Sequence, residues 1–166
     1  MMERYNKGRV IVYNTYQFYK HETLGELREA YLVAREKGYL IGGKLVRGAY
    51  MEKERLRARE GEYLDPIHKQ KEDSDTDFNA AVDFCLEHIA CISVCLGTHN
   101  EYSSQYCVEK MKKLQLAPND PRVWFAQLLG MSDTISFNLA HAGYNVAKYV
   151  PYGPVEAVMP YLFRRA

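Results

Sequence analysis

The chain has 166 residues, of which 47% are hydrophobic and 26% are charged. This composition is typical of one soluble globular domain with a real core, and it excludes disordered and fibrous proteins. The 22 Lys and Arg residues nearly balance the 21 Asp and Glu residues, and the net charge of +1 gives no sign of a nucleic-acid partner or an anionic membrane. No apolar run reaches the roughly 20 residues of a spanning helix, and residues 1–8 do not resemble a targeting segment. A compact small-molecule ligand is therefore the favoured partner.

The cysteines and histidines show neither a disulfide pattern nor a metal-binding pattern. The sequence contains no C-x-x-C pair and no H-E-x-x-H motif. Cys85, Cys91, Cys95 and Cys107 lie inside apolar stretches, which is typical of reduced, buried thiols in an intracellular protein. We therefore predict no structural metal.

Five short runs of strand-forming residues alternate with helical patterns along the chain. We place the strands at residues 10–13, 39–46, 92–96, 123–125 and 146–150. Nearly continuous apolar runs are expected when both faces of a parallel sheet are covered. Because crossovers between parallel strands are right-handed, the two candidate α/β folds are an open doubly wound sheet and part of a (β/α)8 barrel. No G-x-G-x-x-G motif follows a strand, which argues against a dinucleotide-binding open sheet.

Four helices are predicted between these strands. They cover residues 24–34, 78–89, 103–114 and 132–142, and Gly38 and Gly143 follow the first and the last as plausible stops. Residues 51–77 form a highly charged stretch that is longer than the ~2–6 residues of an ordinary βα loop. We interpret this stretch as a solvated insertion with a helical start, the alternative being a mobile lid. The chain has no internal repeat, low-complexity tract or linker, so one domain over residues 1–166 is expected.

Polar side chains at the ends of the strands are the candidates for chemistry, because a parallel barrel builds its site at the carboxyl ends of its strands. Lys44 and Arg47 interrupt an apolar run and are followed by Gly48. Alternation places the two cations on opposite faces of the strand, so burial of either would require an anionic partner or a bound ligand. The alternative is a pair of exposed side chains whose charged ends reach solvent.

Later strand ends add further polar groups. Thr98, His99 and Asn100 follow the third strand in a row, and turn chemistry would explain only Asn100. After the fifth strand, Arg164 and Arg165 lie three and four residues beyond Tyr161, which puts all three on adjoining faces of one helical turn. A pair of guanidinium groups is a good carboxylate clamp, although such a pair is also common on exposed helix surfaces.

Five motifs in this order and spacing resemble proline dehydrogenase and the equivalent domain of bifunctional proline utilisation proteins. The motifs are K-L-V-R-G-A-Y at 44–50, G-T-H-N at 97–100, F-A-Q-L-L-G-M at 125–131, K-Y-V-P-Y-G at 148–153 and Y-L-F-R-R at 161–165. The resemblance runs from residue 13 to the last residue. It implies a distorted (β/α)8 TIM-type barrel, and the chain would supply about five of its parallel strands with their helices.

The resemblance also implies the chemistry. Such an enzyme binds FAD and oxidises L-proline to Δ1-pyrroline-5-carboxylate by moving a hydride from proline C5 to flavin N5, and it passes the electrons to a membrane quinone. Peripheral membrane association is then expected of a full-length parent, at the cytoplasmic membrane in a bacterium or at the matrix side of the mitochondrial membrane in a eukaryote. The cofactor carries out the hydride chemistry, so no nucleophile or base is assigned.

The family's functional residues are carried over by motif. Those expected around the substrate are Arg164 and Arg165 as the carboxylate clamp, with Tyr149, Tyr161, Leu128 and Tyr50 around the ring. Those expected beside the flavin are Asn14, Lys44, Val46, Arg47, Gly48, Ala49, Thr98, His99 and Asn100. Lys44 stands where the bifunctional proteins have Arg and keeps the positive charge. Tyr149 favours proline as the substrate. In the similar hydroxyproline dehydrogenases, the resemblance implies a smaller residue at the matching position, which leaves room for the ring hydroxyl.

Three alternatives remain beside this reading. A hydroxyproline dehydrogenase would use the same site with more room around the ring. A non-catalytic half-barrel would need a second chain, because the strands that would supply an acidic residue and a further lysine are expected to precede residue 1; its two open sheet edges would favour self-association. A barrel enzyme acting on a phosphorylated substrate is disfavoured, because no Gly-rich phosphate loop follows the fourth or fifth strand.

Overall fold

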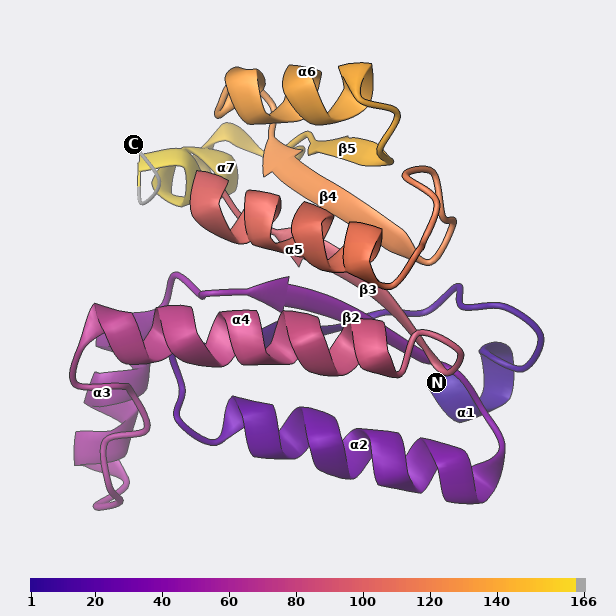
Figure 1. Cartoon of the computed structure of the whole chain (residues 1–166). Coiled ribbons are helices and arrows are strands. Elements are labelled where there is room, and N and C mark those ends of the chain that lie inside the picture. The colour runs from indigo at the N-terminus through magenta and orange to yellow at the C-terminus, as the bar shows by residue number, and fades with distance from the viewer. Residues whose placement is uncertain (164–166) are drawn as a thin grey trace.

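Five parallel strands form one sheet in the computed structural model, which describes residues 1–163 (Figure 1). The strands are β1 (Asn14–Gln17), β2 (Ile41–Val46), β3 (Ile92–Gly97), β4 (Val123–Leu128) and β5 (Val146–Tyr149). Each strand pairs with the next one along the chain, in the order β1-β2-β3-β4-β5. A doubly wound sheet would reverse its order at a switch point, whereas a barrel keeps it. The predicted partial barrel is thereby confirmed.

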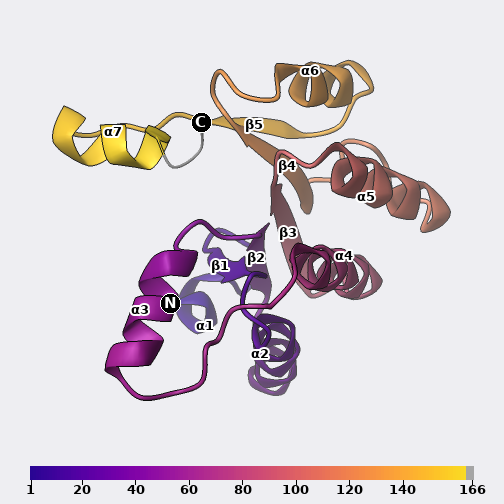
Figure 2. The same ribbon diagram turned by 90° about the vertical axis from the view of Figure 1, so that its left-hand side faces the viewer.

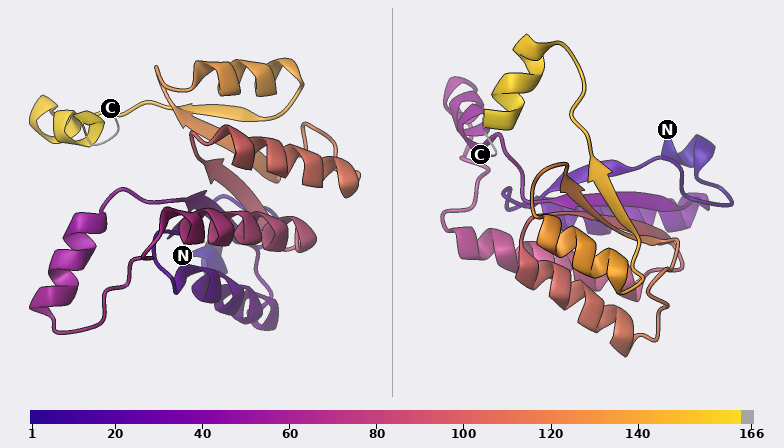
Figure 3. Two further views of the ribbon diagram at one scale, coloured as in Figure 1. Left: turned by 60° about the vertical axis from the view of Figure 1, so that its left-hand side comes forward. Right: turned by 90° about the horizontal axis from the view of Figure 1, so that it is seen from above.

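Helices alternate with these strands as predicted. They are α1 (Met2–Tyr5), α2 (Thr23–Lys37), α3 (Met51–Glu60), α4 (Lys71–Glu87), α5 (Glu101–Lys113), α6 (Asp133–His141) and α7 (Val155–Phe163). Viewed along the strands, α2, α4, α5 and α6 form an arc over one face of the sheet (Figure 2). In contrast, α3 and α7 lie beyond the carboxyl ends of β2 and β5 (Figure 3). Among residues 1–163, no helix combines the length and apolar composition needed to cross a bilayer.

The sheet buries one face and leaves the other partly open. Side chains that face the helices are buried, among them Ile41, Leu45, Leu96, Val123 and Phe125. Each such side chain contributes roughly 1.5–3 kcal/mol to stability when it is fully buried. On the opposite face Trp124 is 37% exposed and Tyr149 is 48% exposed. The near-continuous apolar runs therefore reflect a well-covered outer face and a second face that the described residues cover only in part.

The predicted position of the first strand is wrong, because the paired residues begin at Asn14 rather than at residue 10. The buried side chain of Asn6 provides hydrogen-bond partners for the backbone just before β1, where a strand would use a neighbouring strand. Its Oδ1 accepts hydrogen bonds from the backbone N–H groups of Ile11 (3.0 Å) and Val12 (2.9 Å), and its Nδ2 donates to the Val12 carbonyl (2.8 Å). With these polar groups satisfied, residues 10–13 run as irregular backbone.

The charged stretch at 51–77 is more ordered than a solvated insertion. Its predicted helical start is confirmed by α3, but α4 already begins at Lys71, seven residues before the predicted start. The connection between them is tied to the loop after β1, because the His68 N–H donates to the Tyr19 carbonyl (2.9 Å) and Ile67 is buried. Elsewhere the Gly38 stop is confirmed, since its backbone is left-handed and its N–H donates to the Ala34 carbonyl.

All four cysteines are free thiols, as predicted. Cys85 and Cys107 are fully buried in the core, whereas Cys91 and Cys95 are only partly buried. Burial raises the pKa of Cys85 to about 12. This thiol therefore remains protonated and unreactive at neutral pH.

Gly48 provides a test of the local packing after β2. Its φ of +103° is rare for residues with a side chain, and a Cβ there would overlap the ring of the buried Tyr19. Gly48→Ala should lower the free energy of unfolding of the purified chain by about 3 kcal/mol, measured by urea denaturation. The control Gly25→Ala meets no atom within 4 Å and lies inside α2. It should leave stability unchanged or raise it by up to about 1 kcal/mol. Equal stability of the two variants would contradict this packing.

Candidate active site

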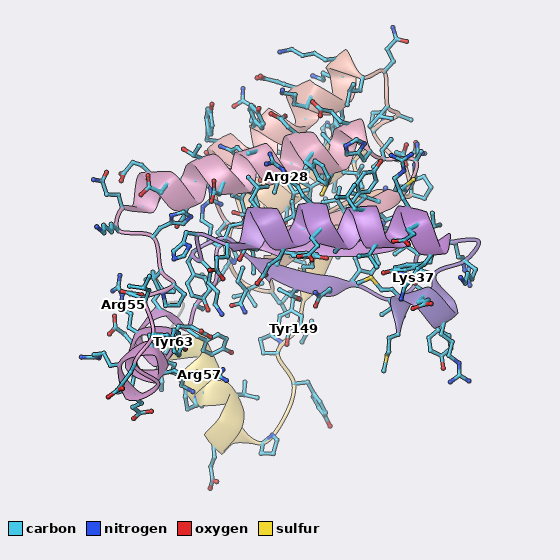
Figure 4. The ribbon with its side chains drawn as sticks, turned by 90° about the horizontal axis from the view of Figure 1, so that it is seen from below. Arg28, Lys37, Arg55, Arg57, Tyr63 and Tyr149 are labelled. Atoms are coloured by element: carbon cyan, nitrogen blue, oxygen red, sulfur yellow. The ribbon has the colours of Figure 1, made fainter. Side chains whose placement is uncertain are left out.

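A pocket of about 750 Å³ lies at the carboxyl ends of the strands. Its volume falls within the roughly 300–1,000 Å³ of small-molecule and cofactor sites. The predicted site residues that line it are Lys44, Val46, Arg47, Gly48, Ala49, Tyr50, Thr98, His99, Asn100, Leu128 and Tyr149. Tyr149 extends from the face of the sheet opposite α2 and α4, toward α7 (Figure 4). The fold therefore brings together side chains from loops that are far apart in the sequence.

The other four predicted site residues are Asn14, Tyr161, Arg164 and Arg165. Asn14 is exposed at the start of β1 and does not contribute to the pocket wall. Arg164 and Arg165 lie outside the described residues, as does the side chain of Tyr161. The roles assigned to these four residues stay predictions.

The pocket also contains residues that sequence reasoning missed. They are Thr15, Gln17, Met51, Lys71, Gly97, Ala126 and Gln127. The alternation of β1 would have identified Thr15 and Gln17 if its register had been known, because Thr15 pairs with Lys44 across the sheet. Lys71 was missed because it was assigned to an insertion rather than to the first turn of α4.

Lys44 lies across the partly open face of the sheet. Its Nζ is 5.3 Å from the centre of the Tyr149 ring, a favourable cation–π distance. Gly97 on β3 makes room for it, because a Cβ there would come within 3.1 Å of the Lys44 Cε. Among the described residues that line the pocket there is no Asp or Glu. The surroundings of Lys44 therefore suit an anionic ligand.

Arg47 points to the other face and is held by the helices. Its Nη1 donates to the Thr98 hydroxyl (2.9 Å), its Nη2 donates to the Ser103 hydroxyl (2.8 Å), and its Nε pairs with Asp75 (2.5 Å). The guanidinium also lies 4.4 Å from the centre of the Phe78 ring. The expected need for an anionic partner is thus met by Asp75 on α4, and Arg47 is fixed before any ligand binds.

Asp75 joins two of the cations that line the pocket. One carboxylate oxygen pairs with Arg47, and the other accepts a hydrogen bond from Lys71 at 2.5 Å. Partial burial alone would raise the pKa of Asp75, but hydrogen bonds from Lys71 and Arg47 outweigh it, so the pKa lies below its ordinary value. Asp75 therefore stays ionised and keeps both cations in place at neutral pH.

The three polar residues after β3 have separate tasks. Asn100 is the N-cap of α5, since its Oδ1 accepts from the Ser103 N–H (3.0 Å). The Thr98 hydroxyl accepts from the Asn100 N–H (3.1 Å) as well as from Arg47. His99 reaches the next loop, where its Nδ1 is 2.8 Å from the Ser132 hydroxyl. Turn chemistry explains Asn100, as expected, and the other two residues shape the pocket wall.

The loop between β4 and α6 is braced from β5. The Lys148 Nζ donates to the carbonyl of Met131 (2.9 Å), lies 3.4 Å from that of Leu128, and pairs with Asp133 (2.7 Å). Leu128 lines the pocket at the start of this loop. The cation of the K-Y-V-P-Y-G motif therefore supports the pocket wall from behind.

Asp75→Asn tests the link between the cations through stability. A lowered pKa in the folded state means that Asp75 contributes stability above its unfolded pKa of ~3.9, and that this contribution is lost as the pH falls through the folded pKa. At pH 7 the variant should be less stable than the parent by about 1 kcal/mol in urea denaturation. The difference should shrink as the pH falls below about 4.

Glu87→Gln, at the exposed last residue of α4, removes the same charge and is the control. It should be nearly neutral or slightly stabilising, because a negative charge at a helix C-terminus opposes the helix dipole. A stability difference between Asp75→Asn and the parent that does not depend on pH would contradict the ion-pair role of Asp75.

Comparison with known proteins agrees with this geometry. The sequence model of the proline dehydrogenase family matches residues 1–166. The chain is 44% identical over 169 residues to human proline dehydrogenase 1, mitochondrial, and 41% identical over 176 residues to the Drosophila melanogaster protein of that name. Hydroxyproline dehydrogenase of Xenopus laevis is 38% identical over 170 residues. These alignments cover 100% of this chain but only 28%, 26% and 36% of the respective relatives.

Solved structures show the same likeness. Proline utilization A from Bdellovibrio bacteriovorus, inactivated by N-propargylglycine, superposes with a TM-score of 0.83 at 26% identity, over 91% of this chain and 16% of that chain. A variant of proline utilization A from Bradyrhizobium japonicum gives a TM-score of 0.81 at 25% identity, over 96% of this chain and 16% of that chain. The chain belongs to the proline dehydrogenase family.

Proposed function

We propose that residues 1–166 are one domain, the C-terminal part of the barrel of an FAD-dependent enzyme that oxidises L-proline to Δ1-pyrroline-5-carboxylate. The observation that carries this proposal is the pocket of about 750 Å³ at the strand ends, lined by cations and by no described carboxylate, in a chain of this family. The chain spans about a quarter to a third of the length of its curated relatives. Experiments on catalysis therefore use a polypeptide of the relatives' length that carries this sequence, here called the extended polypeptide.

The chemistry of the donor set fits FAD. The diphosphate of this cofactor is anionic, and three cationic side chains line the pocket: Lys44, and Arg47 and Lys71, which share the Asp75 carboxylate. The side chains of Val46, Ala126 and Leu128 add apolar surface for a flat ring. We assign the hold on the flavin to the predicted residues Lys44, Val46, Arg47, Gly48, Ala49, Thr98, His99 and Asn100, to Asn14 by its motif, and to Thr15, Gln17 and Lys71 by their position in the pocket.

The protein's task is to place proline and to adjust the charge around it. Bound FAD supplies the hydride acceptor. Lys44 keeps a positive charge on the pocket side of the sheet, where it stabilises negative charge that develops during the reaction. The protein holds the ring by positioning alone, which requires no nucleophile.

We place the substrate between the Arg pair and the aromatic wall. Arg164 and Arg165 bind its carboxylate by planar, bidentate hydrogen bonds, and Tyr161 follows with them by motif. Leu128, Tyr50 and Tyr149 line the pocket and contact the ring in this proposal. The bulk of Tyr149 favours proline over hydroxyproline. The Xenopus laevis relative is named a hydroxyproline dehydrogenase.

The remaining roles also belong to this proposal. Electrons pass to a membrane quinone, so the extended polypeptide would bind the membrane at its surface. The human and Drosophila melanogaster relatives are named as mitochondrial proteins, which favours the matrix side of the mitochondrial membrane if the source is eukaryotic. No nucleic acid or metal is assigned. By itself the chain would associate through the edge strands β1 and β5.

The visible spectrum tests the reaction directly. The extended polypeptide purified with FAD should show a bound-flavin spectrum that L-proline bleaches under anaerobic conditions, because hydride transfer reduces the flavin. Bleaching by trans-4-hydroxyproline should be slower, since Tyr149 restricts the space around the ring. A bound flavin that proline leaves oxidised would refute the assignment. The chain of 166 residues with added FAD forms the second arm, in which we expect a free-flavin spectrum.

Arg164→Met tests the clamp. In the extended polypeptide this change should raise the KM for proline by about 10- to 100-fold, because it removes a charge-assisted partner of the carboxylate. The FAD content of the purified protein should not change. The control Arg59→Met removes an exposed arginine of α3 and should leave KM unaltered. A KM for proline equal to that of the parent would rule out the clamp.

A further inference from the structure

Ser132 has an unusual backbone conformation next to the pocket. Its φ of 51° and ψ of 43° lie in the left-handed helical region, which costs a residue with a side chain roughly 1–2 kcal/mol. It precedes α6 in the N-cap position, where a serine hydroxyl usually accepts a hydrogen bond from the first turn of the helix. The Ser132 side chain makes no such capping bond. The strained serine therefore does not serve the start of its own helix.

The Ser132 hydroxyl instead contacts His99. The distance from its Oγ to the His99 Nδ1 is 2.8 Å, across 33 residues of sequence. His99 lines the pocket, whereas Ser132 is not among the lining residues. A hydrogen bond to one ring nitrogen sets the tautomer and the orientation of an imidazole. The hydroxyl can thus control which edge of the His99 ring faces the pocket, without contacting a ligand itself.

A buried chain of hydrogen bonds holds Ser132 in this conformation. Its carbonyl accepts from the Ser136 N–H (3.1 Å) and lies 3.2 Å from the Ser136 hydroxyl, which also donates to the Gln127 Oε1 (2.9 Å). The Gln127 Nε2 is 3.3 Å from the carbonyl of Thr98, the residue before His99. Gln127, Ser136 and Thr98 are all buried. The bonds thus close a ring that starts and ends at His99.

We propose that Ser132 is a positioning residue for the cofactor site, holding the His99 imidazole in one orientation against the flavin. This inference rests on the proposed function. Backbone strain that persists next to a functional side chain suggests that the side chain of the strained residue is needed. Glycine would relieve the strain and remove the hydroxyl at the same time. Stability and cofactor affinity should therefore respond to Ser132→Gly in opposite directions, which a merely structural serine would not show.

The test compares variants of the extended polypeptide. Ser132→Gly should be at least as resistant to urea as the parent and should bind FAD about two- to tenfold more weakly, because the His99 ring has lost the hydrogen bond to Ser132 that orients it. Ser132→Ala should weaken FAD binding similarly without a gain in stability. Gln115→Gly is the matched control, since Gln115 also has a positive φ of 55° and follows α5 at the opposite end of the sheet. It should leave FAD affinity unchanged.

A second background shows whether Ser132 acts through His99. In His99→Ala, the further change Ser132→Gly should leave the FAD dissociation constant unchanged, because the group that the serine positions is absent. An equal additional loss in that background would overturn the proposal. So would an FAD affinity of Ser132→Gly equal to that of the parent.

A ligand-free measurement separates this inference from the proposed function. The ¹⁵N shifts of the His99 ring in the apo-protein should indicate one dominant tautomer in the parent and a mixture in Ser132→Gly. Failure of the extended polypeptide to bind FAD would refute the proposed function, and the ring shifts would still decide whether Ser132 orients His99. Unchanged shifts in Ser132→Gly would overturn the positioning role.

Discussion

The alternation of side chains along parallel strands is the constraint on which the rest of the molecule depends. From β2 to β5, one face of each strand packs against the helices α2, α4, α5 and α6, and its side chains are apolar until the strand ends. At the carboxyl end the same face becomes polar: Gln127 and Lys148 take the last helix-facing positions of β4 and β5, and Arg47 and Thr98 directly follow β2 and β3. Each of them bonds to a helix or to a neighbouring loop. The core and the rear wall of the pocket are therefore one continuous layer, and a change in helix packing would shift the site.

Charge is distributed unevenly across this layer. Lys44 lies on the pocket side, and no described carboxylate lines the pocket. The carboxylates that balance the cations, Asp75 and Asp133, come from the helix side and pair with Arg47, Lys71 and Lys148. These ion pairs hold the cations in place, so the cations need no reorganisation when an anion arrives. The fold thus prepares a positive cavity and supports it from outside.

The links between consecutive loops explain how five separate motifs can act as one site. Arg47 joins the end of β2 to β3 and α5, Gln127 joins β4 to the loop after β3, and Lys148 joins β5 to the loop after β4. Each bond connects one strand end to a neighbouring one, so the pocket wall is built in sequence around the partial barrel. The chain covers 26–36% of the length of the named relatives.

Local pattern was enough to determine the alternation of strands and helices, the Gly38 stop and the strand-end motifs, because these depend on period, turn chemistry and short-range spacing. The motifs also identified most residues of the pocket. Tertiary structure alone decided the register of β1, because the buried side chain of Asn6 satisfies the backbone of residues 10–13 from outside that segment. It also decided that Asp75 pairs with Arg47 across 28 residues and that Ser132 meets His99 across 33. These partners are too far apart in the sequence for any local pattern to connect them. They meet because parallel pairing brings the ends of successive strands, and the loops and helices that follow them, to one edge of the sheet.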